Sequence, residues 1–194
     1  MTLWFLARAA GFTAVVAASF AVGLGALGSS SPVASRRVLT QLAHRSAAVL
    51  TLAFLALHVV LLVTDSHVDL SALGALVPFT AGWQPVALGL GTLAAYGFGV
   101  VSLTGALRGR LAASAGAARA WRGVHLSAYV AWVLAMGHGI LAGTDTGAGW
   151  ALALYAVCAA GVGAAVAVRL GALARARRAP LHRTRTRALV GAAR

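Results

Sequence analysis

The sequence predicts an all-α fold, a polytopic membrane helical bundle with five transmembrane helices. Of its 194 residues, 60% are hydrophobic and only 10% are charged, and the mean hydropathy is +0.87. Water-soluble globular domains of this size do not have such a composition. Five apolar stretches are also long enough to supply the roughly 20 helical residues that a hydrocarbon core about 30 Å thick requires.

The predicted spans, in chain order, are 3–27, 38–63, 86–107, 124–141 and 150–168. The first carries one charge, Arg8, and has no basic segment ahead of its apolar run, so we expect a retained span rather than a cleaved signal peptide. The second, third and fifth are apolar over a full membrane thickness. The fourth is short, and a helix of spanning length would extend back toward Trp121.

The positions of the charges predict the orientation of these spans. Arginines fill the connections 28–37 and 108–123 and the tail after Val168, whereas the connections 64–85 and 142–149 contain no Arg and all three acids, Asp65, Asp69 and Asp145. Basic residues collect on the cytoplasmic side of membrane proteins. We therefore expect the N-terminus outside and the C-terminus inside, and we interpret the pI of about 12.0 as a sign of topology rather than of nucleic-acid binding.

Three other features narrow the classes of protein. The single cysteine, Cys158, excludes an internal disulfide, and the absence of a CxxCH motif excludes covalent c-type haem attachment. The connection 64–85 is long enough to form a cap over the outer face. Glycine doublets such as GLG and GFG within the spans favour close helix packing or the approach of a flat cofactor, and none completes a dinucleotide-binding motif.

Four histidines lie in two spans that run in the same direction, His44 and His58 in the second and His125 and His138 in the fourth. Their separations of 14 and 13 residues correspond to a rise of roughly 21 and 20 Å. His44 is therefore expected at the depth of His125, near the inner surface, and His58 at the depth of His138, near the outer surface.

Each pair could supply two axial imidazoles to a haem iron, which would stack two haems across the membrane. Zinc or copper sites are disfavoured because the ligands are spread over about 20 Å and no carboxylate or thiolate supports them. On a straight helix His138 would lie about 140° from His125. A bend or local unwinding beside Gly137 and Gly139, which flank His138, would re-aim its ring.

Haem propionates would need cationic partners at each surface. At the inner level the candidates are Arg45, Arg119 and Arg122, of which Arg45 directly follows His44. At the outer level the candidate is Arg8, which could equally be a residue that extends to the interface. The tryptophans at predicted interfaces, which are typical of an aromatic belt, are Trp4, Trp83, Trp121 and Trp150. His67 and His182 lie outside the spans and are not expected to be ligands.

The motifs H-x13-H and H-x12-H on alternate helices are accompanied by the stretches LHVVLLVTDS, VPFTAGWQP and AWRGVHLSAYVAWVLAMGHG. With them the chain resembles the ferric reductase-like transmembrane domain family. This family includes the membrane parts of NADPH oxidases and ferric reductases and the haem-b membrane subunit of the bacterial periplasmic methionine sulfoxide reductase system. The resemblance covers most of residues 3–168, although many members have six spans.

This resemblance implies a haem-binding transmembrane domain over residues 1–170, followed by an Arg-rich cytoplasmic tail over 171–194. It implies two b-type haems, the inner one on His44 and His125 and the outer one on His58 and His138. It further implies electron flow across a bacterial plasma membrane, from a cytoplasmic reduced flavin or flavoprotein to an extracytoplasmic redox partner. No flavin- or nicotinamide-binding domain follows the last predicted span, so substrate chemistry is expected on a separate protein.

Two alternatives stay open at this stage. The outer haem could itself reduce ferric chelates or oxygen, which would make the chain a terminal reductase. In the other alternative the chain binds no haem and is a helical transporter or assembly subunit, in which the histidines join helices by hydrogen bonds or relay protons.

Overall fold

The computed structural model of the chain describes residues 2–28, 34–66, 68 and 70–178. Throughout these ranges the regular structure is α-helical, without a strand. Five helical segments are long and apolar enough to cross a membrane. The predicted fold class, a polytopic helical bundle, is therefore confirmed.

The long helices begin and end close to the predicted spans; α4 is shifted by one residue, and the others are longer than predicted. Their bounds are α1 Thr2–Leu27, α2 Ala34–Thr64, α4 Pro85–Ala106, α6 Ala115–Leu126 with α7 Ala128–Ala142, and α8 Gly149–Arg178. The fourth span extends back past Trp121, as its short apolar run required. Two further short helices, α3 Ala72–Leu76 and α5 Arg108–Leu111, lie in the connections.

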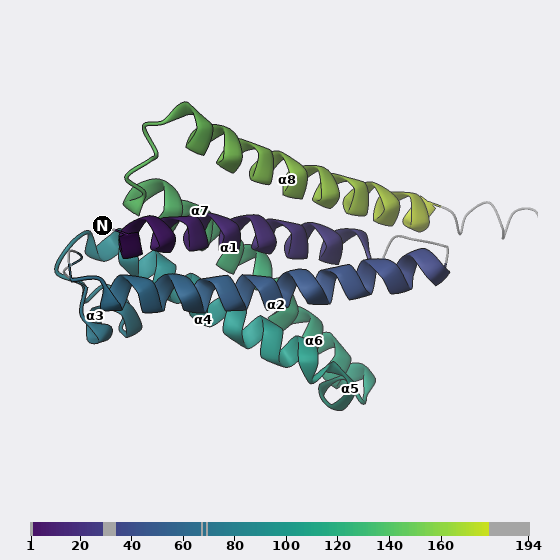
Figure 1. Cartoon of the computed structure of the whole chain (residues 1–194). Helices are drawn as coiled ribbons and strands as arrows, with labels where there is room; N and C mark the ends of the chain where they lie inside the picture. The colour runs from purple at the N-terminus through teal and green to yellow at the C-terminus, as the bar shows by residue number, and fades with distance from the viewer. Residues whose placement is uncertain (1, 29–33, 67, 69, 179–194) are drawn as a thin grey trace, which may run out of the picture.

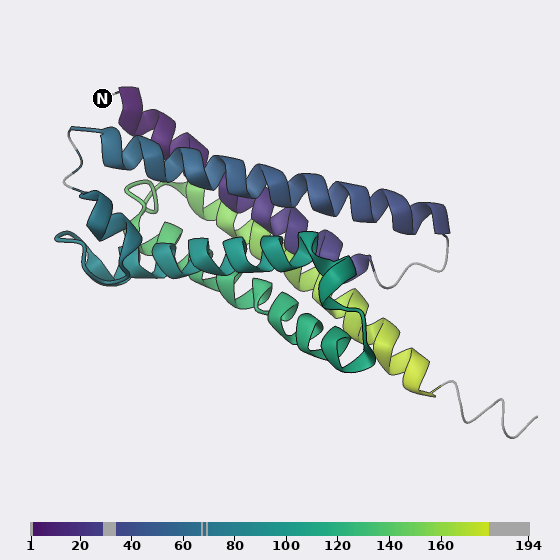
Figure 2. The same cartoon turned by 90° about the horizontal axis from the view of Figure 1, so that it is seen from below.

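Helices α1, α2, α4 and α7 form a four-helix bundle. Helix α1 packs along α2 and α4 packs along α7, while contacts of α1 with α7 and of α2 with α4 close the bundle. Figure 1 shows that consecutive long helices run in opposite directions, and Figure 2 shows the same arrangement from below. Helix α8 packs mainly against α1. The two histidine-bearing segments, α2 and α6–α7, are thus parallel members of one bundle.

Small side chains fill the interior of this bundle, whereas large apolar side chains cover its outer surface. Among the buried residues of α1 are Ala7, Ala10, Ala14, Ala18 and Ala21. Large side chains instead face outward, and Phe20, Val49 and Val157 are between 63% and 71% exposed. Small residues allow close helix contact in membranes, where lipid covers the large apolar groups. This distribution indicates a lipid bilayer as the surrounding medium.

The fourth spanning segment is interrupted at Ser127, between α6 and α7. The Ser127 N–H donates to the Val124 carbonyl at 3.0 Å, and its hydroxyl donates to the same carbonyl at 2.6 Å. The chain thus makes one tight turn two residues after His125. This turn changes the rotational relation between His125 and His138, which a straight helix would place on different faces.

The local unwinding considered beside Gly137 and Gly139 is not present, because both lie within the unbroken helix α7. These glycines accommodate neighbouring side chains instead. A Cβ at position 139 would overlap the Tyr155 hydroxyl, and one at position 137 would lie 3.8 Å from Leu90 Cδ1. Their role is close packing of α7 against α8 and α4.

The connection between α2 and α4 caps one end of the bundle. The hydroxyl of Thr92 donates to a carbonyl of α3 at 3.0 Å, and the hydroxyl of Tyr96 donates to another. Phe79 adopts a left-handed conformation with φ of 67°, and its ring fills the space where Gly89 has no side chain. The connection is therefore packed onto α4.

Charges separate toward the two ends of the bundle. The described arginines other than Arg8 lie near the start of α2, in α5 and α6, and in the last part of α8, and these segments all lie toward the right-hand side in Figure 1. Arg8 and the described acids Asp65 and Asp145 belong to the opposite end. Which end faces the cytoplasm stays a prediction, and Asp69, His67, His182 and most of the predicted tail lie outside the described residues.

Candidate functional site

The structure brings the four histidines together in two pairs. His44 of α2 and His125 of α6 have ring centroids 6.1 Å apart, with an interplanar angle of 70°. His58 of α2 and His138 of α7 have centroids 6.3 Å apart, with an angle of 76°. The two pairs have nearly the same geometry, although they lie at different levels of the bundle.

A backbone carbonyl of a neighbouring helix orients three of the rings. The Nδ1 of His44 lies 2.8 Å from the Ala21 carbonyl oxygen, and the Nδ1 of His58 lies 2.7 Å from that of Ala7. On the other side, the Nδ1 of His138 lies 2.9 Å from the carbonyl oxygen of residue 87.

A carbonyl oxygen only accepts, so each of these Nδ1 atoms carries the proton and donates. The Nε2 atom of the same neutral ring then has a free lone pair. Metal-bound imidazoles are commonly held in this way, because the second nitrogen fixes both the tautomer and the direction of the ring.

The fourth ring, His125, is held differently. Its Nδ1 is buried without a hydrogen-bond partner, while the indole of Trp121 stacks on the ring at a centroid distance of 4.9 Å and an angle of 18°. The Trp121 Nε1 in turn donates to the Thr104 carbonyl of α4 at 3.0 Å. Trp121 therefore has a specific contact with a paired histidine in addition to its predicted place at the membrane interface.

The spacing of each pair fits two imidazoles that share one metal ion. A metal–imidazole nitrogen bond is about 2.0–2.1 Å, and the ring centre lies about 1.1 Å beyond the nitrogen, so the two centres should be about 6 Å apart. A direct N–H···N hydrogen bond between rings would bring the centres to about 5 Å. The observed 6.1 and 6.3 Å agree with the shared metal.

Two protein ligands per site is also the number that a porphyrin iron requires. Within the described part of the chain, no group of three or more His, Cys, Asp or Glu side chains is placed to hold a metal ion. Structural zinc sites take four protein ligands, and catalytic zinc sites take three. A haem iron takes only its axial ligands from the protein.

Glycines lie against all four imidazole rings. Gly11 and Gly25 of α1 face His58 and His44, and Gly91 and Gly105 of α4 face His138 and His125. The glycine doublets drew attention to Gly25 and Gly91, whereas Gly11 and Gly105 were missed. The signal that would have found them is the spacing of 14 residues between the two glycines of each helix, which equals the separation of His44 and His58 and exceeds that of His125 and His138 by one residue.

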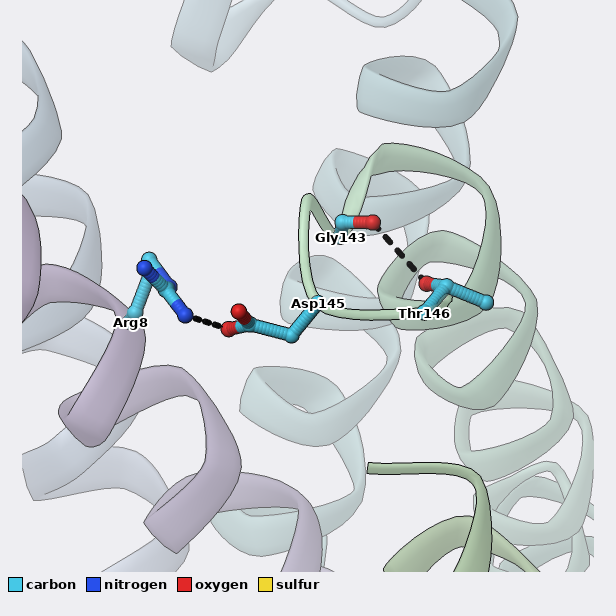
Figure 3. A network of polar contacts seen from close by, with 4 residues as sticks. All are labelled: Arg8, Gly143, Asp145 and Thr146. Atoms are coloured by element: carbon cyan, nitrogen blue, oxygen red, sulfur yellow. Dashed lines mark hydrogen bonds and ion pairs between the residues drawn. The ribbon is translucent and has the colours of Figure 1, made fainter. Parts of the chain in front are cut away.

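Arg8, the outer candidate for a propionate partner, forms an ion pair with Asp145 in the connection between α7 and α8 (Figure 3). Its guanidinium also lies 4.2 Å from the ring centroid of Trp4. Thr146, next to Asp145, donates to the Gly143 carbonyl at 2.9 Å and so closes the turn that presents the carboxylate. The sequence predicts only that Asp145 lies on the outer side, and it gives no indication that Arg8 is its partner.

We expect removal of this ion pair to lower stability. Asp145→Asn should reduce the free energy of unfolding by about 1–2 kcal/mol, because a charge-assisted contact to a mostly buried group is lost. Thermal unfolding in detergent, followed by circular dichroism, measures the change. In a double-mutant cycle with Arg8→Gln, strictly additive effects of the two single substitutions would contradict a direct coupling.

The inner candidates for propionate partners have exposed side chains. Arg45 directly follows His44 on α2. On α6, Arg119 lies six residues before His125 and Arg122 lies three residues before it. Each is therefore at the level of the inner pair and accessible. Their contact with a cofactor stays a prediction.

The sequence matches no protein-family model, and neither a curated protein nor a solved structure is detectably similar to it. The case for function therefore depends on the residues and geometry described above.

Proposed function

We propose that the protein is a membrane cytochrome that transfers electrons across the bilayer through two b-type haems. His44 and His125 hold one haem, and His58 and His138 hold the other. The resemblance of the histidine motifs to the ferric reductase-like transmembrane domain family suggested this function. The present geometry supports it independently of that resemblance.

The observation that carries the proposal is the twofold occurrence of one imidazole pair at metal-sharing distance. Histidines that only join helices by hydrogen bonds would satisfy their Nδ1 atoms as these do, so the carbonyl contacts alone do not decide the matter. Such histidines have no reason to meet a second imidazole at 6.1 Å and again at 6.3 Å. Two axial ligation sites account for both facts.

When bound, haem supplies one-electron chemistry at its iron. The chain positions the rings, fixes their tautomers and surrounds the sites with apolar side chains that keep out water and tune the potential. Among the described residues, no Cys, Asp or Glu side chain joins a histidine pair in a group of three. The proposal assigns substrate chemistry to partner proteins.

The proposed direction is from the Arg-rich end to the opposite end. In a bacterial plasma membrane with the basic end inside, a reduced cytoplasmic flavin or flavoprotein would donate at His44 and His125, and an extracytoplasmic redox partner would accept beyond His58 and His138. The exposed arginines provide a cationic surface that steers an acidic donor.

The test is the visible spectrum and the haem content of the purified protein. We expect a split Soret band, a sharp α band on reduction with dithionite, and two non-covalent haems per chain that acid acetone extracts. Apoprotein reconstituted with hemin in detergent should give the same spectrum. A colourless protein that does not take up hemin would overturn the proposal and favour a haem-free helical transporter or assembly subunit.

A further inference from the structure

Each helix that faces a histidine presents the same two groups to it. On α1 the carbonyl of Ala7 and the Cα of Gly11 face His58. In the same way, the carbonyl of Ala21 and the Cα of Gly25 face His44. In both cases the glycine follows the accepting residue by four positions. The carbonyl and the glycine therefore lie on the same face of the helix, one turn apart.

Helix α4 repeats this arrangement for the other two histidines. The carbonyl of Ala87 and the glycine at 91 face His138. Gly105 faces His125, and the residue four positions earlier is Val101, whose carbonyl the His125 ring approaches without forming a hydrogen bond of normal geometry. We call this combination of an accepting carbonyl and a glycine four residues later an imidazole seat. The bundle contains three complete seats and one incomplete seat among its described residues.

These copies are related by a shift of 80 residues along the chain. Ala7, Gly11 and Gly25 have counterparts at Ala87, Gly91 and Gly105, and His58 has its counterpart at His138. The two outer hydrogen bonds accordingly span the same sequence separation, 51 residues. The segments that begin at His44 and His125, HRSAAV and HLSAYV, correspond with a shift of 81 residues. The pair α1–α2 and the group α4–α6–α7 thus carry these residues at corresponding positions, as parallel repeats would.

The glycine in each seat determines how closely the ring approaches the helix. A Cβ at position 91 would lie 2.7 Å from the Nδ1 of His138, and one at position 11 would lie 3.0 Å from the Nδ1 of His58. At position 25 the nearest ring atom of His44 would be 3.2 Å away, and at position 105 that of His125 would be 3.5 Å away. The distance at position 91 requires the ring to move, those at positions 11 and 25 are tighter than ordinary contacts and require a shift of a few tenths of an ångström, and that at position 105 is an ordinary contact.

Helix packing alone does not explain these four glycines. Gly97 on α4, which does serve packing, faces the methyl group of Ala131, and Gly99 on the same helix faces open space. The glycines of the seats instead face imidazole atoms. In three of the four seats, the Nδ1 of that imidazole also donates to the carbonyl one helical turn before the glycine.

We propose that Gly11, Gly25 and Gly91 are positioning residues for the imidazoles of His58, His44 and His138, whereas the looser contact at Gly105 leaves His125 less constrained. A methyl group at a tight position would push the ring away from its carbonyl and turn its Nε2. The inference rests on the proposed function, since the expected consequence is altered ligation of one haem. It predicts that Gly11 and Gly91 act on the outer haem and that Gly25 acts on the inner haem.

The test uses the full-length protein with alanine at one position at a time. Gly91→Ala and Gly11→Ala should shift the low-spin electron paramagnetic resonance signal and the midpoint potential of the outer haem, or lower the haem content toward one per chain, while the inner haem keeps its signal. Gly25→Ala should change the inner haem only, and Gly105→Ala should have the smallest effect. The matched controls are Gly99→Ala on α4 and Gly23→Ala on α1, which should leave both signals unchanged.

Two results would overturn the inference. Unchanged signals in both Gly91→Ala and Gly11→Ala would show that the glycines do not set the ring positions, and equal changes of both haems would show a general loss of packing. If Gly91→Ala does not yield folded protein, the looser contact makes Gly11→Ala the deciding variant. A wild-type protein without haem would instead refute the proposed function, so the two failures are distinguishable.

Discussion

Replacing His58 or His138 with alanine is expected to remove one haem and leave the other, so that purified protein contains about half of the wild-type haem. In the proposed function each pair shares one iron, and a single remaining imidazole binds a low-spin haem far more weakly than two. The second haem, held about 20 Å away along the helices, keeps both ligands. Haem content and the reduced spectrum measure the loss directly.

The four alanine variants also test the pairing. His44→Ala and His125→Ala should lose the haem that His58→Ala and His138→Ala retain, and the double variant of His58 and His138 should still contain one. All of them should lose electron transfer from one side of a vesicle to the other. The pairing would be wrong if His58→Ala abolished the same spectral component as His125→Ala.

Gly97→Ala is expected to destabilise the protein by about 1–3 kcal/mol, the usual effect of overpacking a close contact. A Cβ at position 97 would lie 2.7 Å from the Ala131 Cβ, which is below van der Waals contact, so α4 and α7 must separate. Because α7 carries His138 and α4 carries the seat that orients it, both stability and haem retention should fall. Thermal unfolding in detergent measures the first, and the Soret absorbance during heating measures the second.

Gly99→Ala is the matched control for this substitution. It lies two residues further along α4, where a Cβ meets nothing within 4 Å, and alanine is favoured over glycine in a helix by up to about 1 kcal/mol. The control should therefore be as stable as the wild type or slightly more stable. If it were destabilised as much as Gly97→Ala, helix propensity or lipid contact rather than the α4–α7 interface would explain the loss.

Much of the fold could be predicted from the sequence, because crossing a bilayer imposes a length of apolar helix that hydropathy detects. The first span was predicted as 3–27 and is Thr2–Leu27. The predictions fell short where helices continue beyond the apolar run, as α2 does back to Ala34 and α8 does on to Arg178. Polar turns at the membrane surface do not register in hydropathy, although they are helical.

The candidate site was predictable only in its side chains. Spacing placed the four histidines at matching levels, but it says nothing of the carbonyls of Ala7, Ala21 and Ala87, since backbone groups have no sequence signal. The tight turn at Ser127 was missed for a similar reason, because a serine within an apolar helix is usually tolerated. The partnership of Arg8 with Asp145 depends on contacts between distant segments and needed the fold.

The ion pair and the outer imidazole are joined by a single peptide unit. Ala7, whose carbonyl oxygen accepts from His58, directly precedes Arg8, whose guanidinium holds Asp145. The connection between α7 and α8 and the His58 ring are in this way attached to consecutive residues of one turn of α1. Any displacement of this loop would therefore act on the same turn of α1 whose carbonyl orients the His58 ring.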